Sequence, residues 1–430
     1  MNATTNDKKG SSSIAKPLYI IGILFFIFGF ITWVSSVLIP YLQIACQLNN
    51  FQAFLVAFAF YISYLFMAVP SGWLLQRVGY KKGMVIGLWV MAIGAFLFIP
   101  AAQTRMYGIF LLGLFLQGSG MAILQTASNP YVTILGPLES AAKRISLMGI
   151  CSGVAGAIAP IILGAIVLSD ADLVKEKLSN ISGDQNTEVL NELAHRVEMP
   201  YLITGIILLS LSFLIGASGL PEIDSDIEDK TLAIANEQKK SIFQFPHLLL
   251  GVLALFLYVG VEVIAGNTII TYAQSQGIPM STAKFFTSAT LIGMLVGYII
   301  GIIAIPKYIA QQNALKICSL LGITFGLGAL FTNGIFSITF IAMLGLANSL
   351  IWPSIWPMAI AGLGRFTKIG SSLLIMAIGG GAFLPLFYGF LTDYIGAKQA
   401  YWMLLPCYLV IYYYSVHGHK IRNTPVLKAI

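Results

Sequence analysis

The chain has 430 residues, of which 57% are hydrophobic and only 10% are charged, and its formal net charge is +7. A water-soluble protein carries roughly 25% charged residues because water must wet its surface, so this composition excludes a soluble globular protein. The four cysteines lie in or beside apolar stretches without CxxC spacing, which argues against disulfides and metal sites built on thiols.

Apolar stretches of membrane-spanning length recur along the whole chain. A helix needs about 20 mostly apolar residues to cross a bilayer, and because unpaired backbone groups are costly in lipid, each stretch is expected to be a helix. We predict twelve spans, over 17–43, 51–75, 83–102, 107–134, 144–168, 201–219, 247–273, 283–305, 315–332, 336–361, 369–392 and 400–416. The first stretch is too long for the apolar region of a cleavable signal, so none is expected.

The basic residues predict the orientation of these spans. With the N-terminus inside, 18 of the 24 Lys and Arg residues fall in cytoplasmic segments, as the positive-inside rule requires. We therefore expect a bacterial inner-membrane protein with both termini in the cytoplasm, and interpret the basic charge as a topology signal without nucleic-acid binding. The histidines at 195, 417 and 419 lie outside the predicted spans and His247 is the first residue of the seventh, so all four are expected on the surface.

The first two spans carry candidate binding and gating residues. A polar tail over 1–16 precedes the first span, where Trp33 is a candidate sugar-binding aromatic side chain. After the second span runs GWLLQRVGYKK, which resembles the major-facilitator loop signature G-x-x-x-D-R-x-G-x-K-K with Gln where Asp is usual. Gly72 would let helices approach closely and Arg77 would reach a helix end at a cytoplasmic gate. The alternative is that the basic residues only anchor the topology.

The fourth span carries two amides on one helical face. Gln125 and Asn129 are four residues apart and therefore point the same way. An amide offers both donors and acceptors, which suits the hydroxyls of a sugar. The alternative is that both side chains join neighbouring helices, as polar side chains do in membranes.

Glu262 is the one acid that falls in the middle of a predicted span, and no Lys, Arg or His shares its depth. A charge there costs about 2.5–3.5 kcal/mol even on the lenient insertion scale, so the residue is expected to face a cavity and to have a function. It could bind a coupling cation such as sodium, carry a proton or accept a bond from a sugar, with Asn267 and Thr268 as further oxygen ligands. A protonated structural glutamate is the alternative.

The tenth span carries two aromatic side chains at the same four-residue spacing as the amides of the fourth span. Trp352 and Trp356 are four residues apart at mid-span, where their rings would form a platform for the C–H surface of a sugar. Asn348 and Ser354 complete the predicted binding face of this span. Trp is also common at membrane interfaces, which is the competing interpretation.

The two halves of the chain repeat. A shift of 225 residues superposes landmarks in several spans, including Gly120 on Gly345 and Pro160 on Pro385. We predict an all-α membrane protein with two pseudo-symmetric six-helix bundles at 17–219 and 245–417, joined by a cytoplasmic linker at 220–244 and followed by a tail at 418–430. Such parallel repeats characterise the major facilitator architecture and its alternating access.

Several segments resemble the fucose–galactose–glucose:cation symporters, and most closely the bacterial glucose/galactose transporters. They include FFIFGF at 25–30, LNNFQA at 48–53, QTASNP at 125–130, LGP at 135–137 and KIGSS at 368–372. The resemblance implies hexose import driven by an ion gradient. One departure matters, because the fucose type has acids where this chain has Ser36 and Gln125, so its proton mechanism cannot be carried over.

We therefore predict a monomeric hexose:cation symporter without enzymatic activity or cofactor. The sugar is expected at Gln125, Asn129, Asn348, Trp352, Trp356, Trp33 and Ser354, and the ion at Glu262 with Ser36, Asn267 and Thr268. Sodium is favoured over the proton because it needs only oxygen ligands and a compensating charge. The alternatives are an amino-sugar (N-acetylglucosamine) or fucose carrier with proton coupling, and a membrane sugar sensor that does not transport.

Overall fold

The computed structural model describes residues 6–134, 141–180, 184–220, 241–305, 307–363 and 366–421. These residues form helices and short connections, with no β-strand among them. Eleven helical stretches in this part of the chain are long and apolar enough to cross a membrane. The twelfth predicted span, 400–416, consists of α20 (Ala397–Ala400), a 3-10 turn at Tyr401–Met403 and α21 (Leu404–Val416), which follow one another directly.

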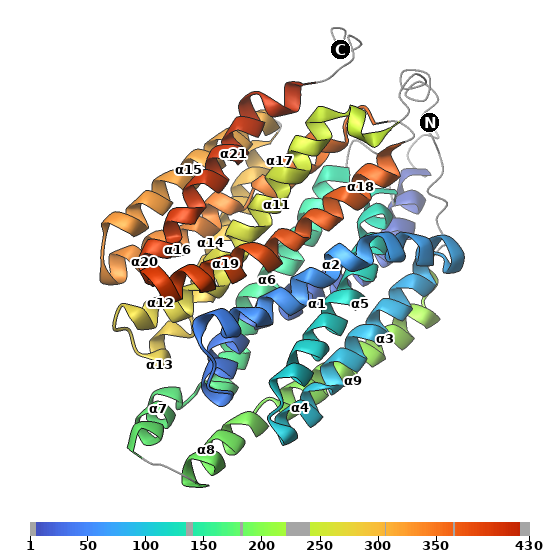
Figure 1. Ribbon diagram of the computed structural model, residues 1–430. Coiled ribbons are helices and arrows are strands. Elements are labelled where there is room, and N and C mark those ends of the chain that lie inside the picture. The colour runs from blue at the N-terminus through green and yellow to red at the C-terminus, as the bar shows by residue number, and fades with distance from the viewer. Residues whose placement is uncertain are drawn as a thin grey trace.

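The described residues of the first half form nine helices (Figure 1). They are α1 (Asn6–Ala45), α2 (Asn50–Val78), α3 (Tyr80–Phe96), α4 (Phe98–Thr104), α5 (Tyr107–Ile134), α6 (Ala141–Val167), α7 (Ala171–Asn180), α8 (Asp184–His195) and α9 (Glu198–Ala217). The helix α1 begins inside the predicted polar tail, but its apolar part, Leu18–Ala45, matches the first predicted span. The polar stretch 169–199 holds two short helices, α7 and α8.

Several spans of the second half are interrupted, unlike their predicted form. The helices are α11 (Pro246–Asn267), α12 (Ile269–Ser275), α13 (Met280–Ala283), α14 (Phe286–Ala304), α15 (Gln311–Phe331), α16 (Gly334–Asn348), α17 (Ile351–Ile360), α18 (Thr367–Met376) and α19 (Gly380–Ile395), before α20 and α21. The seventh span breaks at Thr268, the tenth at 349–350 and the eleventh at a 3-10 turn, Ala377–Gly379. Figure 1 shows that α1 begins and α21 ends at the same end of the bundle, which we call the terminal face.

Helix pairing is the same in both halves. In the first half α1 packs on α6, α2 on α5 and α3 on α9, and in the second half α11 packs on α19, α14 on α16 and α15 on α21. These are the equivalent spans of the predicted repeat. Across the halves, α2 packs on α19 and α6 on α14. The division into domains stays a prediction, because residues 221–240 of the linker lie outside the described residues.

Two glycines permit the equivalent close contacts within each half. Gly29 on α1 lies against the backbone carbonyl of Ser152, and Gly380 on α19 lies against that of Phe256. A Cβ atom at either position would collide with the carbonyl oxygen. Small residues serve this purpose in membrane helices because close backbone approach replaces the hydrophobic driving force that lipid removes.

Large apolar side chains cover the outside of the bundle. Phe213, Ile303 and Phe336 are 66%, 63% and 71% exposed, which suits a surface that faces hydrocarbon. The expectation that all histidines are superficial is wrong for two of them. His247 and His419 are 3% and 7% exposed. Their burial is tolerated because each ring forms a hydrogen bond with a backbone carbonyl near a helix end.

Candidate functional site

Glu262 lies on α11 in the interior of the bundle. Its side chain is half-buried, between the fully buried Val261 and Val263. The hydroxyl of Tyr258, one turn earlier, forms a side-chain hydrogen bond with its carboxyl. No salt bridge to Glu262 is found in the described part of the chain. The carboxyl is therefore held by a neutral hydroxyl and keeps partial access to the space between the helices.

Tyrosines from four helices surround this carboxyl. Besides Tyr258, the side chains of Tyr61 on α2, Tyr298 on α14 and Tyr408 on α21 lie within electrostatic range of Glu262. Tyr61 belongs to the first half of the chain and the other three to the second half. Glu262 therefore lies where the two halves meet and not on the lipid-facing surface.

Gln125 is connected to Glu262 through two of the α2 tyrosines. Its Nε2 donates a 3.1 Å hydrogen bond to the hydroxyl of Tyr64, and the rings of Tyr64 and Tyr61 stack with centroids 6.3 Å apart. Tyr61 in turn lies within electrostatic range of the carboxyl. Asn129, one turn further along α5, is half-buried. Tyr64 and Tyr61 thus connect Gln125, which is predicted to bind sugar, to Glu262, which is predicted to couple the ion.

Asn348 is connected to Glu262 from the opposite side. The hydroxyl of Tyr408 donates a 2.8 Å hydrogen bond to Asn348 Oδ1, and Tyr408 itself lies near Glu262. Asn348 is only 1% exposed, yet its Nδ2 has no partner among the described residues. A buried donor without a partner costs free energy, so this nitrogen is a candidate donor to a ligand.

The two tryptophans of α17 stack on each other. The Trp352 and Trp356 rings are half-buried, with centroids 5.5 Å apart and planes inclined by 22°. The helix keeps its form here although Pro357 has no N–H to bond the carbonyl of Pro353. Gln311 of α15 replaces that donor, with its Nε2 2.6 Å from the Pro353 oxygen. Ser354 is fully buried, and its Oγ has no partner among the described residues.

The remaining predicted ion ligands do not gather at Glu262. Ser36 Oγ donates to the carbonyl of Trp33 in its own helix at 2.8 Å, and Asn267 Oδ1 accepts from Ser35 at 3.3 Å. The hydroxyl of Thr268 is 2.6 Å from that of Tyr401. Positions five and six residues after Glu262 also lie on other sides of a helix with 3.6 residues per turn.

Trp33 is 7% exposed and is enclosed between the halves. Its ring packs against Gly156 of α6 and Gly266 of α11, so that a Cβ at either glycine would press on it. In this structure its neighbours are those of an interhelical packing residue. Its predicted contact with sugar stays a prediction.

The predicted gating residues, Gly72 and Arg77, form no hydrogen bond or ion pair across a gate with another described residue. No atom lies within 4 Å of where a Cβ of Gly72 would be, so the expected close helix approach is not seen. The guanidinium of Arg77 lies 3.7 Å from the ring centroid of Trp73 on the same helix. A cation above an aromatic face is a stable exposed arrangement, and the gating role of both residues stays a prediction.

Comparison with known proteins agrees with this architecture. Residues 21–366 match the Major Facilitator Superfamily. The chain belongs to the Major Facilitator Superfamily. The major facilitator transporter FucP in the outward conformation superposes with a TM-score of 0.73 at 29% identity, over 94% of this chain and 98% of FucP. The protein is thus a multi-pass integral membrane protein of the major facilitator fold.

Its curated relatives are sugar transporters. A glucose/galactose transporter of Brucella abortus biovar 1 (strain 9-941) is 35% identical over 401 residues, which are 93% of each chain. The L-fucose-proton symporter of Escherichia coli (strain K12) is 30% identical over 420 residues, covering 96% of this chain and 95% of that protein. This major facilitator protein is therefore a sugar transporter by family.

The sequence reasoning missed the tyrosines that connect the site. Tyr61 and Tyr64 are three residues apart in one span, and Tyr258 stands four residues before Glu262. Side chains at these spacings share a helical face, so the pattern was available. It carried little weight because tyrosine is common in this chain, with 19 copies.

Proposed function

We propose that the protein imports a hexose of the glucose/galactose type by symport with a cation, through alternating access of its two halves. The observation that carries the proposal is the position of Glu262. Its carboxyl lies between the halves and is linked by Tyr61 and Tyr64 to Gln125 and by Tyr408 to Asn348. The names of the glucose/galactose relatives support the substrate class.

The chemistry of the neighbouring side chains fits a sugar. The amides of Gln125 and Asn348 supply donors and acceptors for hydroxyls, and Asn348 Nδ2 has no partner among the described residues. The stacked pair of Trp352 and Trp356 offers an aromatic surface. Apolar and aromatic walls with a few placed polar groups are the usual composition of small-molecule sites.

We further propose that the coupling ion is a proton bound at Glu262. What supports the proton over the sodium ion favoured by the sequence is the surroundings of the carboxyl. Sodium needs several oxygen ligands, but Ser36, Asn267 and Thr268 bond elsewhere. A proton needs only the carboxyl and the hydroxyls around it, and the relatives include an L-fucose-proton symporter.

Coupling requires that each ligand favours binding of the other. A sugar that contacts Gln125 and Asn348 would reorganise the tyrosines that face Glu262, so protonation and sugar binding would change each other's affinity by the same factor. The energy is sufficient, because one charge moving down about 100 mV yields about 2.3 kcal/mol. A tenfold accumulation of sugar costs about 1.4 kcal/mol.

The orientation follows from the charge distribution. We propose that the terminal face lies in the bacterial cytoplasm, because 18 of the 24 basic residues fall in segments that the predicted topology places there. The opposite face, with α7, α8 and α13, would then meet the periplasm. Impermeant labelling of cysteines placed on each face tests this assignment.

The experiment that tests the function is radiolabelled sugar uptake into proteoliposomes with sodium and proton gradients imposed independently. We expect glucose or galactose to accumulate with an inward proton gradient and not with a sodium gradient alone. Accumulation that follows sodium only would reject the proton while keeping symport. Binding of sugar without uptake under either gradient would indicate a sensor, and selective uptake of N-acetylglucosamine would change the substrate.

A further inference from the structure

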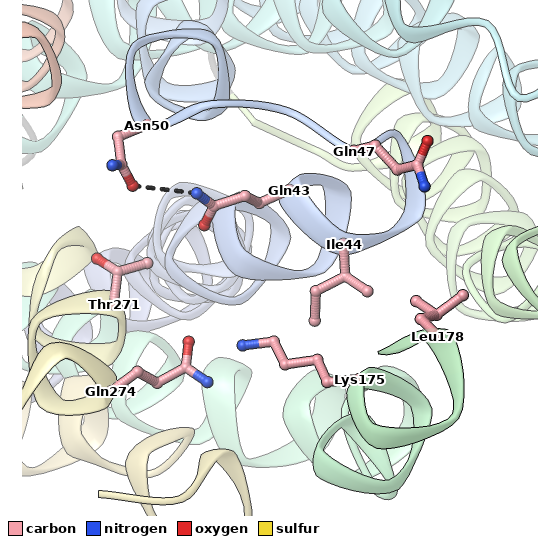
Figure 2. A pocket seen from close by; sticks show the side chains of 8 residues that line it. All are labelled: Gln43, Ile44, Gln47, Asn50, Lys175, Leu178, Thr271 and Gln274. Atoms are coloured by element: carbon pink, nitrogen blue, oxygen red, sulfur yellow. Dashed lines mark hydrogen bonds between the residues drawn. The ribbon is translucent and has the colours of Figure 1, made fainter. Parts of the chain in front are cut away.

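A polar cavity of about 450 Å³ lies between the two halves at the face opposite the terminal face (Figure 2). We call it the outer cavity. It is lined from the end of α1, the start of α2, α7 and α12, with polar side chains of Gln43, Gln47, Asn50, Lys175, Thr271 and Gln274. None of the residues that surround Glu262 lines the outer cavity. The outer cavity is therefore distinct from the site around Glu262, Gln125 and Asn348, which we call the central site.

The lining of the outer cavity has the chemistry of a neutral polyol site. Its four amides can each donate and accept hydrogen bonds, and Figure 2 shows the ends of Gln43, Gln274 and Lys175 turned toward a common space. The charge of Lys175 is opposed by Asp172, three residues earlier. The lining itself carries one positive charge, that of Lys175, which the nearby Asp172 offsets only in part.

Hydrogen bonds connect two lining residues of the outer cavity to a residue of the other half. Gln43 Nε2 donates to Asn50 Oδ1 at 3.0 Å, and Asn50 Nδ2 donates to Asp393 of α19 at 2.6 Å. A ligand hydroxyl that bonds Gln43 or Asn50 would compete with the hydrogen bond between these two side chains or with the bond from Asn50 to Asp393. Occupation of the cavity would thus act on a bond that holds this face closed.

We propose that the outer cavity is a second saccharide site, which captures a neutral sugar at this face before it reaches the central site. The inference rests on the proposed function, because it takes the transported hexose as the ligand. The site contacts both halves, so it exists only while this face is closed. Opening of the face would release the sugar toward the interior.

The test is initial-rate glucose uptake by the full-length protein in vesicles of one orientation, measured from each side. Gln274→Leu removes a lining amide whose side chain has no hydrogen bond to another described residue. We expect the KM for entry from the cavity side to rise about three- to tenfold, the range for one lost hydrogen bond. We expect kcat for entry and the KM for exit from the terminal face to stay unchanged. The kcat for exit should then fall by the factor by which the entry KM rises, because the substitution does not change the equilibrium of transport.

Gln103→Leu is the matched control, because Gln103 is an exposed amide on α4 that does not line the cavity. An unchanged entry KM in Gln274→Leu, or an equal rise from both sides, would overturn the second site while leaving the transport function intact. Stronger competition by gluconate than by unlabelled galactose would overturn the neutral ligand. Absence of hexose transport in the unmodified protein would reject the proposed function itself.

Discussion

The side-chain amide of Asn50, at the start of α2, donates a 2.6 Å hydrogen bond to the carboxylate of Asp393, at the end of α19. The second Asp393 oxygen accepts from the backbone N–H of the next residue of α2 at 3.1 Å. Asp172 of α7 does the same for the other half, accepting from the N–H groups of Met280 and Ser281 at 2.9 and 3.0 Å. Each carboxylate thus caps a helix start of the opposite half.

Replacing Asp393 by Ala should favour opening of this face. The change leaves the Asn50 amide and a helix-start N–H without their acceptor. We expect this to destabilise the closed state by about the net free energy of one exposed hydrogen bond. We expect a cysteine introduced at Thr271, in a background without other cysteines, to react about three- to fivefold faster with an impermeant maleimide. Glu188→Ala, at an exposed acid of α8, should leave the rate unchanged.

Replacing Glu262 by Gln should abolish sugar accumulation driven by a proton gradient. The amide imitates the protonated carboxyl and cannot release the proton, but it keeps the size of the side chain. Exchange of sugar across the membrane at equal concentrations should therefore continue. Counterflow and gradient-driven uptake measured side by side distinguish the two steps, with Glu198→Gln at the start of α9 as the control. Undiminished accumulation in Glu262→Gln would reject the coupling role.

Replacing Tyr64 by Phe should weaken sugar binding at the central site. The change removes the hydroxyl that accepts from Gln125 and lets the amide turn away from its present position. The loss of one hydrogen bond predicts a KM increase of about three- to tenfold, equal from both sides of the membrane. Tyr388→Phe, which removes a hydroxyl bonded to the carbonyl of Ala397 at the start of α20, is the control. An identical KM for Tyr64→Phe and the unmodified protein would contradict the prediction.

Replacing Asn348 by Leu should remove the sugar-dependent rise in thermal stability. In the unmodified protein a bound hexose is expected to raise the Tm, because a ligand that binds only the folded state stabilises it. The Nδ2 group of Asn348 would provide one of the bonds, since it lacks a partner among the described residues. Differential scanning fluorimetry in detergent, with and without glucose, measures the shift. A full sugar-dependent shift in Asn348→Leu would remove this residue from the site.

The ion pair of Asp170 and Arg196 predicts acid sensitivity at the face opposite the terminal face. The hydrogen bond from Arg196 lowers the pKa of Asp170 below its ordinary value. A lowered folded-state pKa gives stability that is present above the unfolded pKa, near 3.9, and lost as the pH falls through the folded value.

Arg196→Met should therefore lower the Tm at pH 7, and this difference should be lost as the pH falls below the unfolded pKa of Asp170 and through its lower folded value. The side chains are 20% and 39% exposed, so the pair contributes no more than about 1 kcal/mol. Thermal melts of both proteins across this pH range measure the effect. A Tm difference that stays constant down to pH 2 would show that lost packing, and not charge, causes it.

Much of the architecture was determined by the sequence alone. Hydropathy decides which segments enter lipid, and eleven of the twelve predicted spans are long apolar helices in the described residues. The broken spans could not be predicted because hydropathy measures apolar content. It does not show where a helix breaks when side chains of other helices satisfy its backbone groups. The carbonyl freed by Pro357 is satisfied by Gln311 from another helix, which no local pattern contains.

The polar partners of the site residues were decided only by the tertiary structure. Sequence singled out Glu262, Gln125 and Asn348 because polar groups are expensive in a membrane. Their connection through Tyr61, Tyr64 and Tyr408 depends on how α2, α5, α16 and α21 meet. Periodicity fixes which residues share a face of one helix, whereas contacts between helices depend on packing that residues distant in the chain determine together.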